Sequence, residues 1–509
     1  MTRGPAAATR TASAGSALVA AQAPDTQPAR ERIKAQAQAR LERLGLRIQP
    51  IVARYKREAS ERSKGHVSAG EMHVAVHLRD LESGAEFGIG ASRPMRPASN
   101  MKLVTTAAAL TLLGSDWRFD TPIEATAAIV GGRLQGDLVL RASGDPLYDI
   151  SGAGRARLLL APALDELERA GLKNVSGDMI LDEGSFDAPA PPPGWPGADQ
   201  RFQEYCALSG GFSINRGCLT IRVAPGSVGA PADIDVQPAG FGLERQYSAM
   251  TAAAGKLTIG FDARSSGLIV RGSIPAKSQP FTGSCPVPDP VDLFACVLRH
   301  ELGSRGIRIE GKNVRQRGAP GGDVLARINT PLLIYLQPIN QESNNAVADQ
   351  VFLGTAQAFL GSAARKSAER ATLAALERLH VLDDGFRQVD GSGLSDLNRV
   401  SARQLSALIH SVLSGDARVA LAFRESLAIA GVSGTLDKRM QNSPAKGRVF
   451  AKTGFIAGTS ALSGVALGAD DRQLVFSILV NYEEFGGLNT SVWKPMEDEI
   501  CGLLVGARP

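Results

Sequence analysis

The sequence predicts an α/β (α+β) protein whose single catalytic domain is interrupted by β-rich insertions. A chain of 509 residues is too long for one hydrophobic core, which indicates several domains. Strand-like runs separated by Gly and Pro fill residues 119–328, whereas helical periodicity returns after Pro331 and the chain ends strand, strand, strand, helix. We therefore expect residues 65–120 and 327–509 to form one catalytic domain around an inserted middle.

The first 23 residues have the features of a secretory signal peptide. Arg3 and Arg10 precede a small, apolar stretch at residues 12–21, and Ala21-Gln22-Ala23 has the small-x-small form of a cleavage site. The alternative is an Ala-rich tail without a targeting role. The signal predicts export to the periplasm or an equivalent extracytoplasmic compartment.

Residues 24–64 predict a basic helical arm or tether. Residues 1–64 hold 13 Lys and Arg against 5 Asp and Glu, a net charge of 13 − 5 = +8, so the other 445 residues carry 5 − 8 = −3. The stretch has helical spacing that is interrupted near Gly45 and Pro50. Such an arm is either simply solvated or attaches peripherally to a membrane or an anionic wall polymer. Because no base-reading motif accompanies the charge, we expect no nucleic-acid partner.

The elements that follow are defined by their hydrophobic periods. Residues 71–90 alternate apolar and polar side chains on both sides of Ser83-Gly84, which predicts a β-hairpin. A helix that is apolar on almost every face opens at Pro97-Ala98-Ser99 and stops at Gly114, so we expect it to be buried. Further strands are expected at residues 134–142, 175–181, 218–223, 257–261, 268–274, 448–453, 460–467 and 473–482, and helices at residues 344–360, 362–379, 401–413 and 491–504. Two segments of similar sequence, at residues 136–140 and 177–181, indicate paired hairpins of one β-rich domain.

Residue spacing excludes several kinds of site. The five cysteines (Cys206, Cys218, Cys285, Cys296 and Cys501) show no CxxC spacing, which argues against zinc; in an exported protein Cys206 with Cys218 and Cys285 with Cys296 are the closest pairs, with the connectivity open. Residues 306–313 lack the final Ser or Thr of a phosphate-binding loop, and His300-Glu301 lacks the second histidine of a zinc-protease helix. We expect neither a metal nor a cofactor.

Ser99-Asn100-Met101-Lys102 contains the candidate nucleophile. Residues three apart on a helix face the same way with Cβ atoms about 5 to 6 Å apart, so Lys102 can reach the Ser99 hydroxyl. Burial lowers the pKa of a lysine, which makes a neutral base available, and the helix N-terminus favours negative charge on the serine oxygen. The same spacing at residues 443–446 and 491–494 has no buried helix start beside it.

Ser343-Asn344-Asn345 opens a predicted helix and supplies two more polar groups. We expect Ser343 to relay a proton between Lys102 and the leaving amine, and Asn345 to hold the substrate amide. The other Ser-x-Asn, at residues 213–215, precedes a strand and predicts a turn.

Lys452-Thr453-Gly454 closes a predicted strand. An edge strand beside the nucleophile aligns an extended peptide by main-chain hydrogen bonds, while Lys452 and Thr453 meet its terminal carboxylate. Gly454 leaves space where the substrate backbone passes. The amides of Ser99 and Phe455 are expected to form the oxyanion hole.

With these motifs in this order, the sequence resembles the D-alanyl-D-alanine carboxypeptidase/endopeptidase family, the class C low-molecular-mass penicillin-binding proteins. The likeness covers about residues 70–505. It includes Arg96-Pro97-Ala98-Ser99-Asn100, Ser143-Gly144-Asp145-Pro146, Asp390-Gly391-Ser392-Gly393-Leu394-Ser395, Gly434-Thr435-Leu436 and Ser460-Ala461-Leu462-Ser463-Gly464. The resemblance implies a penicillin-recognising transpeptidase/β-lactamase-like domain with two inserted β-rich domains, which we place at residues 121–204 with 282–326 and at residues 205–281.

The resemblance also implies a function. We expect a serine D-Ala-D-Ala carboxypeptidase, endopeptidase or both, which acts on peptidoglycan stem peptides through an acyl-enzyme on Ser99 and is inhibited covalently by β-lactams. The alternatives are a β-lactamase-like or esterase-like hydrolase on the same fold and a peptidoglycan-binding scaffold of low activity. Three positions depart from the family pattern: Phe455 stands where a small hydroxylated residue is usual, Asn344 where aspartate is frequent, and Asp396 where arginine is common. Phe455 is expected to narrow the site, and Asp396 to alter the binding of a substrate with an extra carboxylate.

Overall fold

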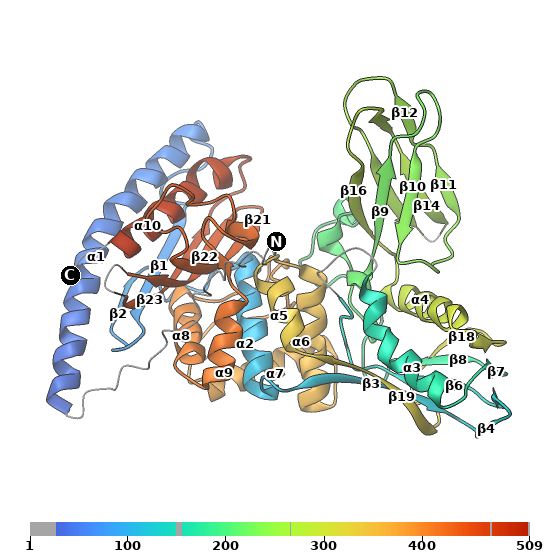
Figure 1. The fold of residues 1–509 in the computed structure, drawn as a ribbon. Helices are drawn as coiled ribbons and strands as arrows, with labels where there is room; N and C mark the ends of the chain where they lie inside the picture. The colour runs from blue at the N-terminus through green and yellow to red at the C-terminus, as the bar shows by residue number, and fades with distance from the viewer. Residues whose placement is uncertain (1–26, 149–154, 265, 469–470, 507–509) are drawn as a thin grey trace, which may run out of the picture.

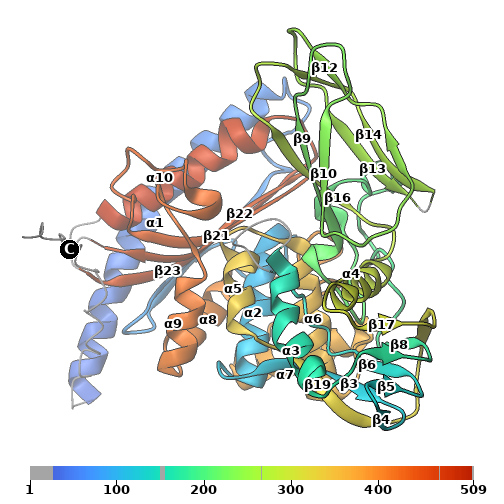
Figure 2. The same ribbon diagram turned by 45° about the vertical axis from the view of Figure 1, so that its right-hand side comes forward.

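The computed structural model describes residues 27–148, 155–264, 266–468 and 471–506. The predicted signal peptide, residues 1–23, lies outside these ranges. In the described part of the chain the fold consists of a large sheet covered by helices, followed by a strand-rich insertion that extends away from it (Figure 1). A view turned by 45° shows the same separation (Figure 2).

A six-stranded antiparallel sheet forms the centre of the part of the chain that flanks the insertion. Its order is β2-β1-β23-β22-β21-β20, and β1 pairs with β23 so that the two ends of the sequence share one sheet. The predicted hairpin is confirmed as β1 and β2, and the three predicted C-terminal strands as β21 to β23. The strands are β1 His73–Asp80, β2 Glu86–Ile89, β20 Ala428–Ile429, β21 Val449–Ile456, β22 Thr459–Leu467 and β23 Gln473–Asn481.

Helices cover both faces of this sheet. On one face lie α1 (Gln27–Arg62) and α10 (Lys494–Gly506), and on the other lies a bundle built around α2 (Met101–Leu113) (Figure 1). Helix α2 is buried along its first ten residues, as its apolar sequence predicts. The bundle confirms the three main predicted helices, α6, α7 and α8, and adds two short ones, α5 and α9; the bounds are α5 Leu333–Asn340, α6 Asn345–Leu360, α7 Arg365–Arg378, α8 Ala402–Leu413 and α9 Ala417–Glu425.

The predicted interruption of the basic arm is wrong, because α1 is one helix that includes both Gly45 and Pro50. A Cβ at Gly45 would lie 2.1 Å from the ring of Phe87, so this glycine allows close packing on β2 rather than ending the helix. Pro50 lies on the exposed side, where the loss of a backbone hydrogen bond is compensated by water. Helix α1 buries Leu41, Ile48 and other residues against the sheet and α10, so it is a surface helix and not a tether. None of the helices in the described ranges is long and apolar enough to cross a membrane.

The insertion begins and ends with a pair of long antiparallel strands, β3 (Arg118–Ala125) and β19 (Asp323–Pro331). They belong to a five-stranded sheet of order β18-β8-β6-β3-β19, beside a four-stranded sheet of order β17-β7-β5-β4. Two helices that the strand-rich texture did not predict, α3 and α4, pack in this region. The bounds are β4 Ile129–Val130, β5 Arg133–Leu134, β6 Leu138–Arg141, β7 Asn174–Val175, β8 Met179–Asp182, β17 Arg308–Ile309, β18 Asn313–Gln316, α3 Ala161–Arg169 and α4 Pro290–Ser304.

The two similar segments of the insertion, residues 136–140 and 177–181, do pair, but not as hairpins. Strand β6 runs parallel to β8, with Leu138 opposite Met179, because α3 forms a crossover between them. Asp137 Oδ1 accepts a hydrogen bond from the amide of Asp178 (2.8 Å), so the two similar segments begin side by side in the sheet. The repeat therefore marks neighbouring strands of one sheet.

Strands β9 to β16 form the outermost part of the insertion (Figure 2). Their sheets have the orders β10-β9-β16, β11-β14-β13 and β12-β15. The predicted division between residues 281 and 282 falls inside β16, and one continuous hydrophobic cluster joins this part to the five-stranded sheet. The bounds are β9 Cys218–Ala224, β10 Asp233–Gln237, β11 Arg245–Tyr247, β12 Met250–Ala252, β13 Gly260–Arg264, β14 Gly267–Arg271, β15 Ser273–Pro275 and β16 Phe281–Pro286.

Candidate active site

Ser99 lies in a short 3-10 turn, Ala98–Asn100, that leads directly into α2. Its hydroxyl Oγ accepts a hydrogen bond from Lys102 Nζ at 3.1 Å, as the Ser-x-x-Lys spacing predicts. The turn is fixed to the sheet by Asn100: in the orientation that satisfies its neighbours, its amide donates to the backbone oxygen of Lys452 (2.8 Å) and accepts from Ser463 Oγ (2.7 Å). Ser99 is thus held between α2 and β21.

Lys102 is completely buried, and its ammonium group contacts three oxygens. Besides Ser99 Oγ, Nζ donates to Asn345 Oδ1 (2.6 Å) and to the backbone oxygen of Ser392 (2.7 Å). Burial lowers the pKa of Lys102 from 10.5 to about 7, against the opposing charges of Asp390 and Asp349. The neutral amine is therefore well populated at neutral pH and can accept the proton of Ser99.

The Ser-x-Asn motif lies in the loop between α5 and α6. Ser343 has a φ of 65°, a left-handed conformation that is uncommon for serine, and its Oγ accepts a hydrogen bond from Lys452 Nζ at 2.8 Å. Asn345 is the first residue of α6 and points its amide oxygen at Lys102. Asn344 caps the same helix through Oδ1, which accepts from the amide of Val347 (3.0 Å). An asparagine therefore performs here a capping role that aspartate would fill equally well.

Lys452 is the second fully buried lysine of the site. Burial, together with the neighbouring charge of Lys102, holds its pKa well below 10.5. In the ranges that the structure covers, its hydrogen-bond partners are Ser343 Oγ and the backbone oxygen of Thr453, and no carboxylate lies within ion-pair distance. An anion that binds beside a buried lysine without an ionic partner stabilises its ammonium form, so the site favours an anionic ligand. Next to it, Thr453 Oγ1 donates to Thr435 Oγ1 at 2.8 Å.

Gly454 has a structural reason in addition to the expected space for a substrate. A Cβ there would lie 2.8 Å from the backbone oxygen of Pro97 and 3.2 Å from the amide nitrogen of Ser99. The glycine thus lets β21 approach the turn that carries Ser99.

The second half of β21 has an open edge. The backbone oxygen of Arg448, just before β21, accepts from the amide of Leu467 of β22, whereas the backbone oxygen of Val449 accepts from the amide of Ala430 beside β20. Because backbone groups alternate along a strand, the odd-numbered residues of β21 point theirs away from β22. Strand β20 is paired with β21 only at Phe450 and Ala451. The amide of Phe455 therefore points to the side where β20 has ended. The Phe455 side chain is 58% exposed at this edge.

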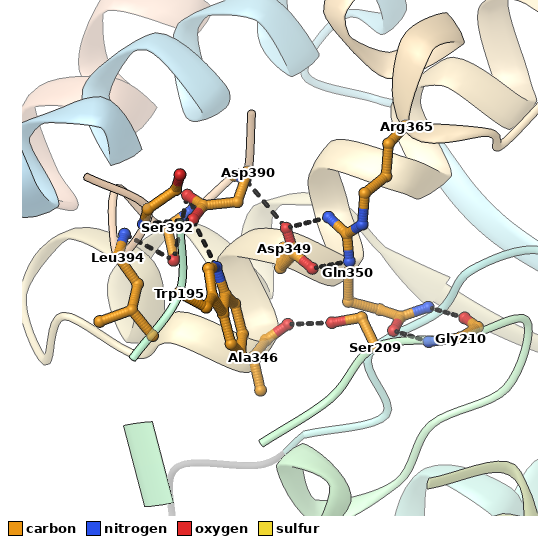
Figure 3. A network of polar contacts seen from close by, with 12 residues as sticks. Trp195, Ser209, Gly210, Ala346, Asp349, Gln350, Arg365, Asp390, Ser392 and Leu394 are labelled. Carbon is orange, nitrogen blue, oxygen red and sulfur yellow. Dashed lines mark hydrogen bonds and ion pairs between the residues drawn. The ribbon is translucent and has the colours of Figure 1, made fainter. Parts of the chain in front are cut away.

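The structure gives a supporting role to the loop of residues 390–398, in which the sequence had assigned a role only to Asp396 (Figure 3). Its buried Asp390 accepts hydrogen bonds from the amides of Ser392, Gly393 and Ser395 (3.0, 2.5 and 2.7 Å), which folds the loop around the carboxylate. The loop presents the Ser392 carbonyl to Lys102. The run of Asp, Gly and Ser in the sequence was the available signal, since such a run is typical of a side chain that caps a tight turn.

A second buried carboxylate lies next to this loop. Asp349 of α6 forms a two-pronged ion pair with Arg365 of α7 (3.0 and 2.8 Å) and accepts from the amide of Gly391 (3.0 Å) (Figure 3). It therefore joins two helices to the loop that holds the lysine.

The remaining sequence candidates lie away from this centre or at its rim. Asp396 is exposed, and its amide donates to the backbone oxygen of Gly194 (3.0 Å). Residues 443–446 form a turn, and residues 491–493 lie in a π-helical turn that leads into α10 at Lys494. Residues 213–215 precede β9, where Asn215 donates to the backbone oxygen of Cys218. All five cysteines are free thiols, and four of them are buried.

Comparison with known proteins gives a consistent result. The sequence profile of the D-Ala-D-Ala carboxypeptidase 3 (S13) family matches residues 67–500. The chain is 32% identical over 426 residues to a D-alanyl-D-alanine carboxypeptidase of Actinomadura sp. (strain R39), covering 80% of this chain and 77% of that protein. It is 27% identical over 410 residues to the D-alanyl-D-alanine carboxypeptidase DacB of Haemophilus influenzae, covering 78% and 82%. The crystal structure of penicillin binding protein 4 (dacB) from H. influenzae has the same fold, with a TM-score of 0.71 at 23% identity, covering 88% of this chain and 97% of that one.

Proposed function

The chain belongs to the D-Ala-D-Ala carboxypeptidase 3 (S13) family of serine peptidases, and from this premise we propose that it cleaves the D-alanyl-D-alanine bond of peptidoglycan stem peptides through an acyl-enzyme on Ser99. The observation that carries the proposal is the contact of Ser99 Oγ with the buried Lys102 Nζ at 3.1 Å. A serine needs a neighbouring base to act as a nucleophile at neutral pH, and a lysine can be that base only when its pKa is strongly lowered.

In the proposed acylation step, neutral Lys102 takes the proton of Ser99 as Oγ attacks the carbonyl carbon of the penultimate D-alanine. The amides of Ser99 and Phe455 donate to the oxyanion; a donor of this kind contributes about 10²- to 10³-fold in rate. Ser343 passes its proton to the nitrogen of the leaving D-alanine and regains one from protonated Lys102, the C–N bond breaks, and water later hydrolyses the ester. The proton relay is supported by the hydrogen bond that orients Ser343 Oγ on Lys452.

The proposed substrate specificity rests on Lys452 and the open edge of β21. The terminal carboxylate of the peptide supplies the anion that buried Lys452 lacks, with Thr453 beside it. The penultimate residue lies along β21 and pairs with the backbone of Thr453 and Phe455. β-Lactams present a carboxylate and a reactive amide in one rigid molecule, so we propose that they acylate the same serine; a H. influenzae relative of this fold has been crystallised with a β-lactam. The same chemistry acts on terminal D-alanine and on cross-links, so we propose both carboxypeptidase and endopeptidase activity, outside the cytoplasm.

Labelling with a fluorescent penicillin tests the nucleophile. We expect a covalent adduct with the wild-type protein and none with Ser99→Ala, whereas a label that survives this substitution overturns the assignment. An adduct that forms and is lost within seconds would indicate a β-lactamase-like enzyme instead. Mass spectrometry of digested peptidoglycan then reports the released D-alanine and any opened cross-links.

We also propose that the outer face of α1 contacts an anionic membrane surface. Arg43, Arg47 and Arg57 are exposed on the face opposite the buried stripe, together with Leu46, which is 70% exposed. Sedimentation with phosphatidylglycerol vesicles, compared with phosphatidylcholine vesicles, tests this contact. Binding to isolated cell wall but not to vesicles would assign the face to a wall polymer.

A further inference from the structure

A segment of the insertion, residues 193–205, touches the catalytic centre at two places, and we call it the bracing segment. Its first part lies on the loop 390–398. The backbone oxygens of Pro193 and Gly194 accept from Ser395 Oγ (2.7 Å) and from the amide of Asp396 (3.0 Å). The indole of Trp195 donates to Asp390 Oδ2 at 2.7 Å (Figure 3).

Trp195 supplies a donor that the loop itself does not have. In the described part of the chain, all other hydrogen bonds to the carboxylate of Asp390 come from residues 392–398 of its own loop. Asp390 is fully buried, and a buried carboxylate is costly unless its oxygens are bonded. Trp195 therefore helps to fix Asp390, although it lies almost 200 residues earlier in the sequence.

The loop that Asp390 organises is pressed against the nucleophile and its base. Gly393 has a φ of 82°, and a Cβ there would lie 1.9 Å from the backbone oxygen of Ala98, which precedes Ser99. One residue earlier, the Ser392 oxygen accepts from Lys102 Nζ at 2.7 Å. A relaxed loop would thus withdraw an acceptor from Lys102.

The end of the bracing segment holds a second acceptor of Lys102. The backbone oxygen of Tyr205 accepts from Asn345 Nδ2 at 2.9 Å, which leaves Oδ1 of the same amide turned toward Lys102. Nearby, Gln350 exchanges two hydrogen bonds with the backbone of Gly210 (2.6 and 3.3 Å), so this part of the insertion is docked on α6 (Figure 3). Two of the three oxygens that contact Lys102 Nζ are therefore positioned by the insertion.

Burial has the largest effect on the protonation of Lys102 and lowers its pKa, and nearby charged groups act beside it. Asp390 and Asp349 favour its ammonium form, Arg365 offsets the charge of Asp349 through their ion pair, and the charge of Lys102 in turn lowers the pKa of Lys452. Hydrogen bonds from Nζ to neutral oxygens also favour the ammonium form, because they are strongest to a charged donor.

We propose that Trp195 is a positioning residue for the serine–lysine pair: it holds Asp390, which fixes the Ser392 carbonyl against Lys102. The insertion is thereby coupled to the catalytic base rather than only carrying a separate surface. This inference rests on the proposed function, in which Lys102 activates Ser99.

The test is the pH dependence of the second-order rate of acylation by a fluorescent penicillin, with each variant normalised by titration of its active serine. Trp195→Phe keeps an aromatic ring but removes the N–H donor. We expect the plateau rate to fall about tenfold, because a hydrogen bond to a charged group is lost. We expect the acidic limb to move to lower pH by about 0.5 unit or more, because the ammonium form of Lys102 loses an acceptor. A merely structural loss would lower the amount of active enzyme without moving the limb.

Trp117→Phe is the matched control. Trp117 is also half-buried and packs on Phe119 with ring centroids 4.5 Å apart, but within the described ranges its indole makes no hydrogen bond. If Trp195→Phe gives the same pH profile as Trp117→Phe, the proposal is overturned. If Trp195→Phe does not fold, Ser395→Ala decides, because it removes one bond of the bracing segment: a smaller shift of the limb in the same direction supports the proposal, and an unchanged limb refutes it. A wild-type protein that takes no label overturns the proposed function itself.

Discussion

Asn345→Asp is the most direct perturbation of the buried lysine. Asn345 Oδ1 lies 2.6 Å from Lys102 Nζ, and the substitution places a negative charge there with almost no change of shape. An opposite charge at such a distance raises the pKa of a lysine by about 1 to 3 units. With a starting pKa of about 7, half of Lys102 is neutral at pH 7. After the substitution the neutral fraction, and with it the acylation rate at pH 7, should fall by about 5-fold to 500-fold and recover as the pH rises.

The assay is the rate of covalent labelling by a fluorescent penicillin between pH 5 and pH 10. The wild type should show an acidic limb with a midpoint near pH 7, and the variant a limb displaced to higher pH. Loss of the bond to Tyr205 also lowers the plateau, but it does not move the limb to higher pH. Asn344→Asp is the matched control, because this neighbour caps α6 and an aspartate caps equally well. An unchanged limb in Asn345→Asp would show that Lys102 is not the base.

Three further changes test other parts of the site. Gly454→Ala should slow acylation at least about tenfold, because the added Cβ would clash with the turn that carries Ser99. Gly486→Ala is the control and should not slow it, because a Cβ there meets no atom within 4 Å. Equal rates for the two variants would contradict the close approach of β21. Arg365→Met leaves the completely buried Asp349 without its ion-pair partner. Urea titrations should show a free energy of unfolding that is lower by about 3 to 5 kcal/mol. A loss below about 1 kcal/mol would mean that the carboxylate finds another partner. Phe455→Thr should leave the melting temperature unchanged, because the ring is exposed, but should change the relative rates on stem peptides and penicillin; constant relative rates would remove Phe455 from the specificity site.

The elements that the sequence predicted best are those whose structure depends on local pattern. The sequence of the helix that carries Lys102 is apolar on nearly every face and is followed by a glycine, which predicts a buried helix that stops there. In the structure this helix, α2, is buried and ends at Gly114. The predicted break at Gly45 failed because a glycine in a helix can also mark close packing, and only the position of Phe87 distinguishes the two. The partners of the strands in the insertion were likewise inaccessible, since periodicity indicates that a strand exists but not whether its neighbour is parallel.

By itself the sequence determined the chemical groups of the site and their order, because Ser99 and Lys102 are one helical turn apart and their contact is local. Only the tertiary structure decided the surroundings that set the pKa of that lysine. Its burial and the oxygens from Asn345 and Ser392 come from segments more than 240 residues away. The hydrogen bond from Trp195 to Asp390 likewise joins residues that lie 195 positions apart in the sequence. A pKa depends on the surroundings of a group in space, and that information is distributed over the whole chain.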